Sequence, residues 1–284
     1  MIHPDFMSRP PAPVTGKELF RRRSLGCLAV LLAAPLLYYG LHVALRTPPL
    51  APTQLIAHRG GPKYAPENTL VAFEHAIAQG VEWLEFDVQM SRDGVLVIIH
   101  DETVDRTTNG TGAVRDLTFA QIRALDAGKG EKVPTFQEVV ELAKANRVKL
   151  LPETKAAHLY PGLEEKMLHV LDEAGYLDQT IIQSFEAASL DTLHRLNPQA
   201  HLCALYGPGS FSVSTPPGDA QFVCPMAEMV LLNPGIIRQA HGEGRQVFIW
   251  FGLLENPLLF KVMRFFGAEG LMSDDPVAVR EAIK

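Results

Sequence analysis

The feature of this sequence that most constrains its fold is a regular alternation, from about residue 54 onward, of short apolar runs with longer amphipathic stretches. The apolar runs have the length of buried strands and cover 55–58, 81–88, 148–153, 180–184, 201–206, 221–224, 246–250 and 270–273. Stretches with helical periodicity lie between most of them, at 69–79, 135–146, 162–174, 187–196, 234–242 and 256–266. Repeated strand–helix units favour a parallel α/β fold, and these eight runs predict a TIM (β/α)8 barrel.

A doubly wound sheet is the alternative arrangement of such units. A fold of that kind that binds a dinucleotide carries a glycine-rich GxGxxG turn after its first strand. No such motif follows residues 55–58. The barrel is therefore the expected architecture.

One segment departs from the alternation. Residues 81–90 and 95–100 both resemble strands and are separated by the turn-forming sequence SRDG. Two strands joined by so short a turn form a β-hairpin rather than a strand–helix–strand crossover. Pairing Met90 with Val95 across this turn would place His100 opposite Glu85.

An apolar stretch of membrane-spanning length precedes the alternating region. Residues 25–45 read LGCLAVLLAAPLLYYGLHVAL, close to the roughly 20 apolar residues that a helix needs to cross a bilayer. The sequence RRR at 21–23 precedes this stretch, and the positive-inside rule then makes residues 1–24 a cytoplasmic tail. We expect an uncleaved single-pass anchor in an inner (cell) membrane, with the following domain on the non-cytoplasmic side. A cleaved signal peptide and a soluble helix are the alternatives.

Residues 46–53 separate the apolar stretch from the alternating region. They include Pro48, Pro49 and Pro52, which fix φ and favour an extended path, so a stiff linker is expected there. The folded domain would then cover residues 54–284.

The distribution of charge and of cysteine narrows the classes of function. The net charge of −6 combines +4 over residues 1–46, which hold six basic and two acidic residues, with −10 over the remainder. An acidic body argues against nucleic acid as a partner, because backbone phosphates require a cationic face. The three cysteines, Cys27, Cys203 and Cys224, show no CxxC spacing that would indicate zinc, and no disulfide is expected.

Acidic residues gather at the carboxyl ends of predicted strands, where barrel enzymes place their sites. Glu85 and Asp87 lie two apart on one strand, so their side chains point to the same face. Glu153 ends another strand, and Lys155 follows two residues later. Carboxylates on an inward face repel one another and lose hydration, and a cation such as Mg²⁺ or Ca²⁺ relieves both costs. The simpler alternative is a set of ion-paired, structural carboxylates.

Two histidines end strands near these carboxylates. His58 closes the first strand in the sequence HRGG, and His100 closes the hairpin. A single histidine on an apolar strand is usually a satisfied core residue, but two that converge on one carboxylate pair are suited to acid and base roles. Arg59 is suited to bind a phosphate oxygen. A cation, a guanidinium and two imidazoles together indicate metal-assisted phosphodiester cleavage.

These residues lie in motifs that resemble those of a known family, the glycerophosphodiester phosphodiesterases, which have a phospholipase C-like TIM barrel. The resemblance spans residues 55–276. Its motifs are AHRGGPKYAPENT at 57–69, EFDVQMSRDGVLVIIHDETVDRTTNGTG at 85–112, VPTFQEVV at 133–140, PETK at 152–155 and SDDP at 273–276. It implies a catalytic barrel over 54–284 with a small insertion around 102–132.

The resemblance also implies roles for individual residues. The implied ligands of one divalent metal ion, Mg²⁺ or Ca²⁺, are Glu85, Asp87 and Glu153. The implied acid–base pair is His58 and His100, and the implied substrate-binding residues are Arg59, Glu67, Lys155 and Trp250. The products in the family are an alcohol and glycerol 3-phosphate, and the glycerol hydroxyl next to the phosphate is thought to attack first.

The sequence departs from the family after Trp250, where members often carry a polar run. The residues that follow here include Leu253, Leu254, Leu258, Leu259 and Phe260. They are either the core face of a helix or an apolar lip that admits an acyl chain. The second interpretation makes a lysophospholipase D acting on membrane lysophospholipids the alternative function. A catalytically silent barrel that binds phospholipid head groups is an alternative of another class, which would be expected to lack one of the histidines or metal ligands.

Overall fold

The computed structural model describes residues 33–210 and 212–284. The chain divides into two compact units, Met1–Leu45 and Arg46–Lys284. In the first unit, residues 33–44 are helical and largely exposed. The predicted tail over 1–24 and residues 25–32 of the predicted anchor lie outside the described residues. Within the described part of the chain, no helix combines the length and the hydropathy needed to cross a membrane, so the anchor stays a prediction.

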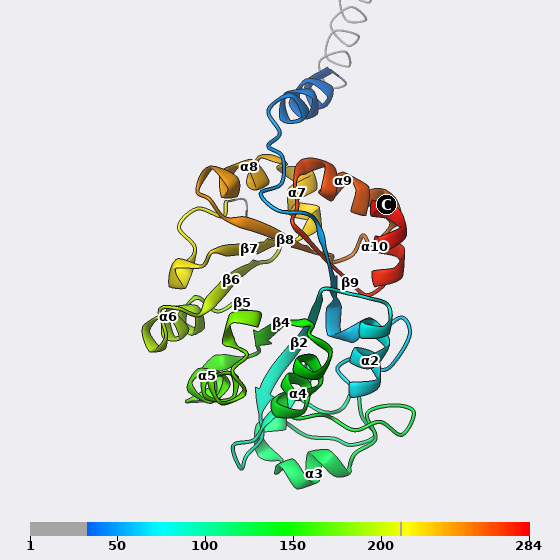
Figure 1. The fold of residues 1–284 in the computed structure, drawn as a ribbon, viewed down its shortest axis with the longest axis vertical. Helices are drawn as coiled ribbons and strands as arrows, with labels where there is room; N and C mark the ends of the chain where they lie inside the picture. Colours follow the sequence, from blue (N-terminus) through cyan, green and yellow to red (C-terminus); the bar gives the residue numbers. More distant parts are fainter. Residues whose placement is uncertain (1–32, 211) are drawn as a thin grey trace, which may run out of the picture. The chain divides into compact units, whose positions relative to one another are not determined.

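The second unit is built on a closed parallel sheet (Figure 1). Within its described residues, the eight parallel strands are β1 (Gln54–Ala57), β2 (Trp83–Met90), β4 (Lys149–Thr154), β5 (Ile181–Ser184), β6 (His201–Tyr206), β7 (Phe222–Pro225), β8 (Gln246–Trp250) and β9 (Gly270–Ser273). β1 pairs with both β9 and β2, and this double pairing closes the barrel. The predicted TIM barrel is confirmed.

Helices surround the barrel, and several of them begin at a residue whose side chain caps the helix. They are α2 (Leu70–Ala78), α4 (Phe136–Asn146), α5 (Leu163–Ala174), α6 (Ala187–Leu196), α7 (Ala227–Leu232), α8 (Gly235–Gly242), α9 (Pro257–Phe266) and α10 (Pro276–Ile283). The Thr135 side chain accepts a hydrogen bond from the N–H of Glu138, whose side chain binds back to Thr135, and the Asn256 side chain caps α9. The helices predicted from periodicity are present, whereas α7 and α10 were not predicted.

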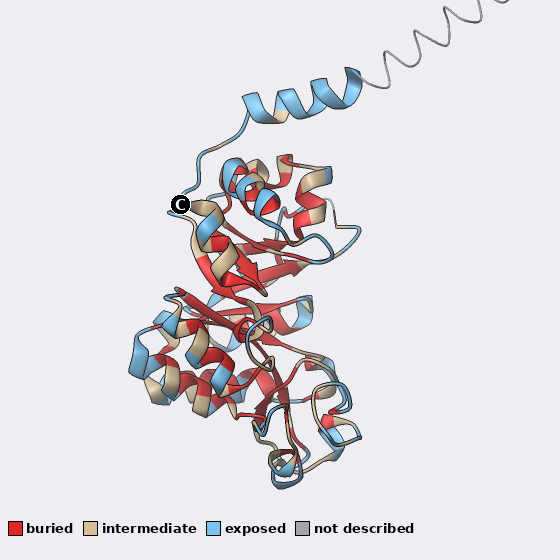
Figure 2. Ribbon diagram, turned by 90° about the vertical axis from the view of Figure 1, so that its right-hand side faces the viewer, coloured by how far each residue is buried: buried red, intermediate tan, exposed pale blue. Residues whose placement is uncertain are grey.

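Two apolar layers hold the barrel together. The larger lies between the sheet and the surrounding helices, and the smaller fills the inside of the barrel with residues such as Trp83, Leu151 and Phe248. Figure 2 shows buried strands enclosed by helices that are buried on one face and exposed on the other. Along β2, Leu84 and Phe86 belong to the outer layer while Trp83 belongs to the inner one, as the period of two predicts.

A disulfide joins Cys203 on β6 to Cys224 on β7 inside the barrel. Leu205 pairs with Cys224 and Cys203 with Phe222, so the two cysteines are diagonal neighbours with Cα atoms 6.3 Å apart. That distance suits a disulfide. The expectation of no disulfide is therefore wrong, because the pairing depends on the register of two strands, which the spacing of the cysteines does not indicate.

The predicted hairpin is present, with β2 antiparallel to β3 (Leu96–Ile98). Its predicted register is wrong by one residue, because Met90 pairs with Leu96 rather than Val95. Ser91 belongs to the pairing and not to the turn, since its N–H donates to the carbonyl oxygen of Val95 at 2.9 Å. Ile99 consequently binds the carbonyl of Asp87, and His100 is not opposite Glu85.

The insertion after the hairpin has a small core of its own. Val104, Val114 and Ile122 pack there against Val97 and Ile99 of the hairpin. The short helix α3 (Phe119–Ala124) lies in this segment, with Ile122 as its buried residue. The insertion is thus a compact attachment to the hairpin rather than an irregular loop.

Residues 46–53, expected to form a linker, bind the N-terminal end of the barrel. The N–H of Leu50 donates to Glu269 at 2.5 Å, and the Thr53 hydroxyl donates to the carbonyl of Ala268 at 2.8 Å. Thr47 lies 2.6 Å from Nδ1 of His241, whose other nitrogen lies 3.0 Å from Glu269. Both acceptor residues precede β9, so this segment lies at the end of the barrel opposite the carboxyl ends of the strands.

Candidate active site

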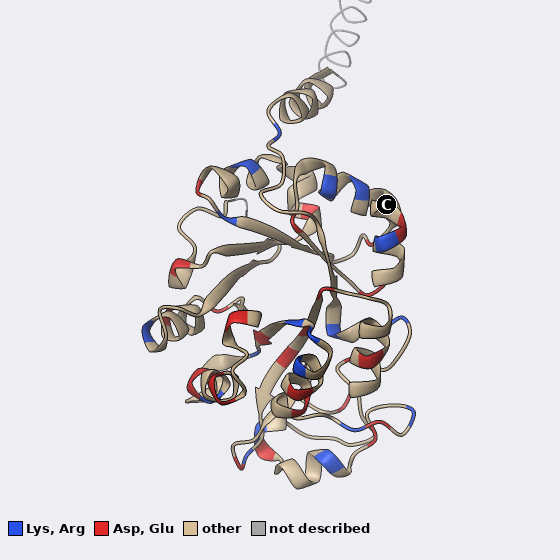
Figure 3. Cartoon of the chain, in the orientation of Figure 1, with Lys and Arg blue, Asp and Glu red and all other residues tan. Residues whose placement is uncertain are grey.

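Charged residues occur mainly on the helices and loops, but acidic positions also lie on β2 at the centre of the barrel (Figure 3). A cavity of about 340 Å³ opens there at the carboxyl ends of the strands. Its lining residues are His58, Arg59, Glu85, His100, Glu153, Lys155, Gln183, Phe185, Leu205, Trp250, Phe251, Gly252, Met272 and Asp274. The structure therefore brings seven of the nine predicted site residues to one cavity, while Asp87 and Glu67 lie behind it.

Three carboxylates form the predicted metal-binding cluster. Glu85 and Asp87 come from β2 and Glu153 from β4, where Asp87 and Glu153 are paired neighbours in the sheet. All three are buried, and one oxygen of each lies within 4.8 Å of the others. Neighbouring strands of a barrel thus place three oxygen ligands around one point.

The chemistry of this cluster fits a divalent cation. Burial raises the pKa of Glu85 to about 7 and that of Glu153 to about 8. Asp87 keeps a lowered pKa, because Lys155 and Arg59 outweigh its burial. Asp87 Oδ1 accepts no hydrogen bond from the described residues, although Lys155 Nζ lies 3.5 Å away. Buried, partly unsatisfied carboxylate oxygens suit Mg²⁺ or Ca²⁺.

Two buried amides hold the carboxylates in place, and neither was predicted. Gln183 Nε2 on β5 donates to Glu85 Oε1 at 3.0 Å, and Asn68 Nδ2 donates to Asp87 Oδ2 at 2.9 Å. Asn68 has a left-handed backbone (φ 57°) just before α2, and this conformation is more accessible to asparagine than to most residues. Asn68 could have been found in the PENT motif, whereas no signal in the sequence singled out Gln183.

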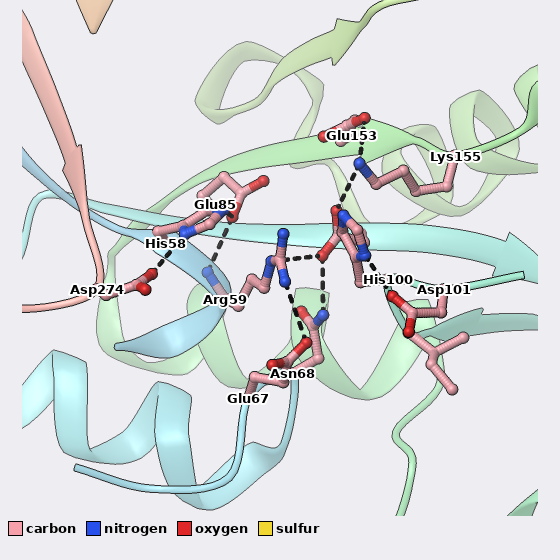
Figure 4. A network of polar contacts seen from close by, with 12 residues as sticks. His58, Arg59, Glu67, Asn68, Glu85, His100, Asp101, Glu153, Lys155 and Asp274 are labelled. Atoms are coloured by element: carbon pink, nitrogen blue, oxygen red, sulfur yellow. Dashed lines mark hydrogen bonds and ion pairs between the residues drawn. The ribbon is translucent and has the colours of Figure 1, made fainter. Parts of the chain in front are cut away.

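Arg59 lies in a turn that directs both its backbone and its side chain to the carboxylates (Figure 4). The turn is left-handed at Arg59 (φ 49°) and at the following Gly60, where a Cβ would lie 2.8 Å from that of Ala72. The Arg59 N–H donates to Glu85 Oε2 at 2.9 Å. Its guanidinium lies 3.4 Å from Asp87 and 3.2 Å from the predicted residue Glu67. Glu67 thus orients Arg59 from behind the cavity.

The two histidines each have a carboxylate on Nδ1. Asp274, which follows β9, lies 2.5 Å from Nδ1 of His58, and Asp101 lies 2.6 Å from Nδ1 of His100. Such a contact fixes the imidazole and leaves Nε2 toward the cavity, and Nε2 of His58 is 4.0 Å from Glu85. Sequence reasoning missed both partners, although Asp101 lies in the quoted motif at 85–112 and Asp274 in that at 273–276.

The electrostatic surroundings of the two histidines differ. Burial lowers the pKa of His58, but the carboxylates of Glu85 and Asp274 outweigh it and raise the pKa above its ordinary value. Burial also lowers the pKa of His100, where the cations Lys155 and Arg59 oppose the effect of Asp87, and that pKa stays below its ordinary value. The cavity therefore presents two imidazoles with opposite tendencies to hold a proton.

Lys155 and Trp250 complete the predicted set. Lys155 Nζ lies 2.7 Å from Glu153 Oε1, directly beside the carboxylate cluster. Trp250 donates its indole N–H to the carbonyl of Tyr206 at 3.1 Å and packs edge-on against Phe185, with 5.7 Å between ring centroids. The cavity thus has cationic and aromatic groups close together, since Lys155 Nζ lies 5.7 Å from the centroid of the Phe185 ring.

The apolar residues after Trp250 divide between the two interpretations. Leu259 and Phe260 are buried on the core face of α9. Leu253 and Leu258 are 89% and 72% exposed. Glu228 on α7 accepts hydrogen bonds from the N–H groups of Leu253 and Leu254, each at 2.7 Å, so the loop beside the cavity has a fixed conformation. The core explanation therefore holds for Leu259 and Phe260 but not for Leu253 in the loop or for Leu258 in the first turn of α9.

Comparisons with known proteins agree with the motifs. A sequence model of the Glycerophosphoryl diester phosphodiesterase family matches residues 58–278. The chain is 35% identical over 237 residues to a glycerophosphodiester phosphodiesterase of Caldanaerobacter subterraneus, covering 79% of this chain and 95% of that protein. It is 30% identical over 249 residues to a glycerophosphodiester phosphodiesterase of Bacillus altitudinis, covering 82% and 100%.

A solved structure adds a neighbour that contains a bound product. This is an Oleispira antarctica phosphodiesterase in complex with the product sn-glycerol-3-phosphate, with a TM-score of 0.72 and 26% identity. The alignment covers 81% of this chain and 96% of that one. The resemblance inferred from the motifs is confirmed.

The raised pKa values of Glu85 and Glu153 predict how a divalent cation stabilises the protein. Both folded-state values, about 7 and about 8, exceed the ordinary 4.5, so the cation-free folded state loses stability as pH rises through this window and the protons dissociate. A cation binds the deprotonated carboxylates. We expect the increase in Tm on adding Mg²⁺ or Ca²⁺ to be larger at about pH 8.5 than at about pH 6 by scanning calorimetry.

Two variants control this measurement. Glu85→Gln should remove most of the cation-dependent increase in Tm, and Glu74→Gln, which changes an exposed carboxylate on α2, should keep it. An equal increase at both pH values would contradict the assignment of these carboxylates as the cation ligands.

Proposed function

Because this chain belongs to the glycerophosphoryl diester phosphodiesterase family, we propose that it hydrolyses glycerophosphodiesters to an alcohol and glycerol 3-phosphate by metal-assisted acid–base catalysis. The observation that carries the proposal is the single cavity lined by two buried carboxylates, two oriented imidazoles and a guanidinium, with the third buried carboxylate, that of Asp87, within 4.8 Å of the first two. The product bound to the Oleispira antarctica neighbour supports the choice of substrate.

In this mechanism the carboxylates of Glu85, Asp87 and Glu153 would hold one Mg²⁺ or Ca²⁺, which neutralises charge on the phosphoryl oxygens. The guanidinium of Arg59 and the ammonium of Lys155 lie beside these carboxylates and would bind the remaining phosphoryl oxygens. Trp250 would form part of the wall of the pocket, next to Phe185. These side chains orient the phosphodiester for displacement of its alcohol.

His58 and His100 would move the protons of the reaction. One imidazole accepts the proton of the attacking hydroxyl, and the other donates a proton to the oxygen of the leaving alcohol as its bond to phosphorus breaks. If the glycerol hydroxyl attacks first, a cyclic phosphate forms and water opens it in a second step with the two roles exchanged. Asp274 and Asp101 keep both rings oriented throughout, through their bonds to Nδ1.

Substitution of the proposed groups should abolish turnover of glycerophosphocholine. We expect His58→Ala and His100→Ala each to lower kcat by at least about 100-fold, the scale of acid–base catalysis, and Glu85→Gln to remove activity by weakening the cation site. The measurement is glycerol 3-phosphate release, coupled to a dehydrogenase. His169→Ala, which changes an exposed histidine on α5, is the matched control. A near-normal kcat in either histidine variant would show that the altered histidine has a structural role and not a catalytic one.

We propose that residues 25–45 anchor the protein in an inner membrane with the barrel on the non-cytoplasmic side. The apolar stretch, the preceding arginines and the disulfide between Cys203 and Cys224 support this location, since disulfides persist in oxidising compartments.

Two measurements test this location in cells that express the full-length chain. We expect the chain to sediment with membranes and to require detergent for release. In denaturant, an alkylating reagent should label one thiol without reductant, that of Cys27, and three after reduction. Recovery in the soluble fraction would contradict the anchor, and labelling of three thiols without reductant would contradict the oxidising compartment.

The exposed loop beside the cavity supports a second candidate, lysophospholipase D activity. Leu253 in this loop and Leu258 in the first turn of α9 are exposed, and the loop follows the cavity-lining residues Phe251 and Gly252. If glycerophosphodiesters are the substrates, kcat/KM for glycerophosphocholine should exceed that for lysophosphatidylcholine, measured below its micellar concentration. A higher kcat/KM for lysophosphatidylcholine that is lost in Leu253→Ser would favour the lipid substrate.

All five predicted acid–base and metal residues are present, so a catalytically silent barrel is not favoured.

A further inference from the structure

Arg106, in the insertion that follows the hairpin, joins two parts of the site that the mechanism above treats separately. Its Nε and Nη2 donate to Asp101 at 2.7 and 3.0 Å. Its Nη1 and Nη2 donate to Glu67 at 2.8 Å each. One guanidinium thus binds two carboxylates, each through two hydrogen bonds, which is the geometry that arginine provides and lysine does not.

The two carboxylates bound by Arg106 each orient a different side chain of the cavity. Asp101 lies 2.6 Å from Nδ1 of His100, and Glu67 lies 3.2 Å from Nη1 of Arg59. Figure 4 shows these two pairs, with Asp101 beside His100 and Glu67 beside Arg59. Arg106 itself does not line the cavity. Its connection to the chemistry is through the carboxylates alone.

The insertion holds Arg106 in a defined position. Thr103 and Ala113 form an antiparallel bridge, and the N–H of Val104 donates to the carbonyl of Gly112 at 3.0 Å, so the turn that carries Arg106 is closed at its base. Val104 is fully buried in the small core of the insertion. The guanidinium therefore projects from a fixed turn, although it is 48% exposed.

We propose that Arg106 is a positioning residue, which fixes His100 through Asp101 and Arg59 through Glu67, and that the insertion serves to supply it. The proposal rests on the proposed functions of His100 and Arg59. Removing Arg106 would leave Asp101 free to turn away from His100 and Glu67 free to pull Arg59 from its place beside Asp87. Both the proton-transfer group and the phosphate-binding group would lose their orientation together.

An exposed ion pair that only stabilises the insertion is the alternative, because such pairs contribute little to activity by themselves. The two explanations differ in their kinetic consequences. A stabilising pair would change Tm and leave kcat and KM alone. A positioning residue would lower kcat through His100 and raise KM through Arg59, and its effect would disappear when its carboxylate partners are already altered.

The experiment compares Arg106→Ala, Arg106→Lys, Asp101→Asn and Glu67→Gln, together with the Arg106→Ala/Asp101→Asn double variant, in the full chain with its divalent cation. We expect Arg106→Ala to lower kcat/KM about 10- to 100-fold, as for other residues that orient ligands from behind. Arg106→Lys should restore only part of this loss. Asp101→Asn should act mainly on kcat, Glu67→Gln mainly on KM, and the double variant should be less impaired than the product of the single effects.

Arg123→Ala is the matched control. Arg123 lies in the same insertion and pairs with Glu138, away from the cavity. It should change Tm without changing kcat or KM. Unaltered kinetics in Arg106→Ala, or multiplicative effects in the double variant, would overturn the proposal even if His100→Ala is inactive. Normal activity in His100→Ala would instead overturn the proposed function. If Arg106→Ala does not fold, Asp101→Asn and Arg106→Lys decide the question by the same kinetic criteria.

Discussion

Three carboxylates buried side by side on β2 and β4 are the constraint on which the rest of the site depends. Burial and mutual repulsion raise the pKa of Glu85 and Glu153, so the cluster holds full negative charge only when positive charge is close. Arg59 and Lys155 supply part of that charge, and a divalent cation would supply the rest. The same positive charges would bind the phosphodiester. The charges that stabilise the buried carboxylates in the fold are therefore also those that the reaction needs.

The sequence was sufficient where a short-range rule determines the structure. The period of two along β2 correctly placed the side chains of Glu85 and Asp87 on the same face of the strand. The motifs also gave the predicted site residues, all of which lie in or directly behind one cavity. Their functions remain to be tested by substitution.

Most of the features that the sequence did not predict depend on how strands and side chains align with one another in the folded chain. Whether Ser91 belongs to the strand or to the turn shifts the hairpin by one residue, and turn composition alone does not decide this. The diagonal placement of Cys203 and Cys224 depends on how β6 and β7 align. Gln183 binds Glu85 and Arg106 binds Glu67 across 98 and 39 residues of sequence, so no local pattern predicts these two contacts.

The most direct test of the central claim uses the purified full-length chain in detergent with glycerophosphocholine, following glycerol 3-phosphate release with and without EDTA. The account predicts release that EDTA abolishes and that added Mg²⁺ or Ca²⁺ restores, since the carboxylate cluster needs a divalent cation to act on the phosphodiester. Release at an unchanged rate in excess EDTA would contradict it.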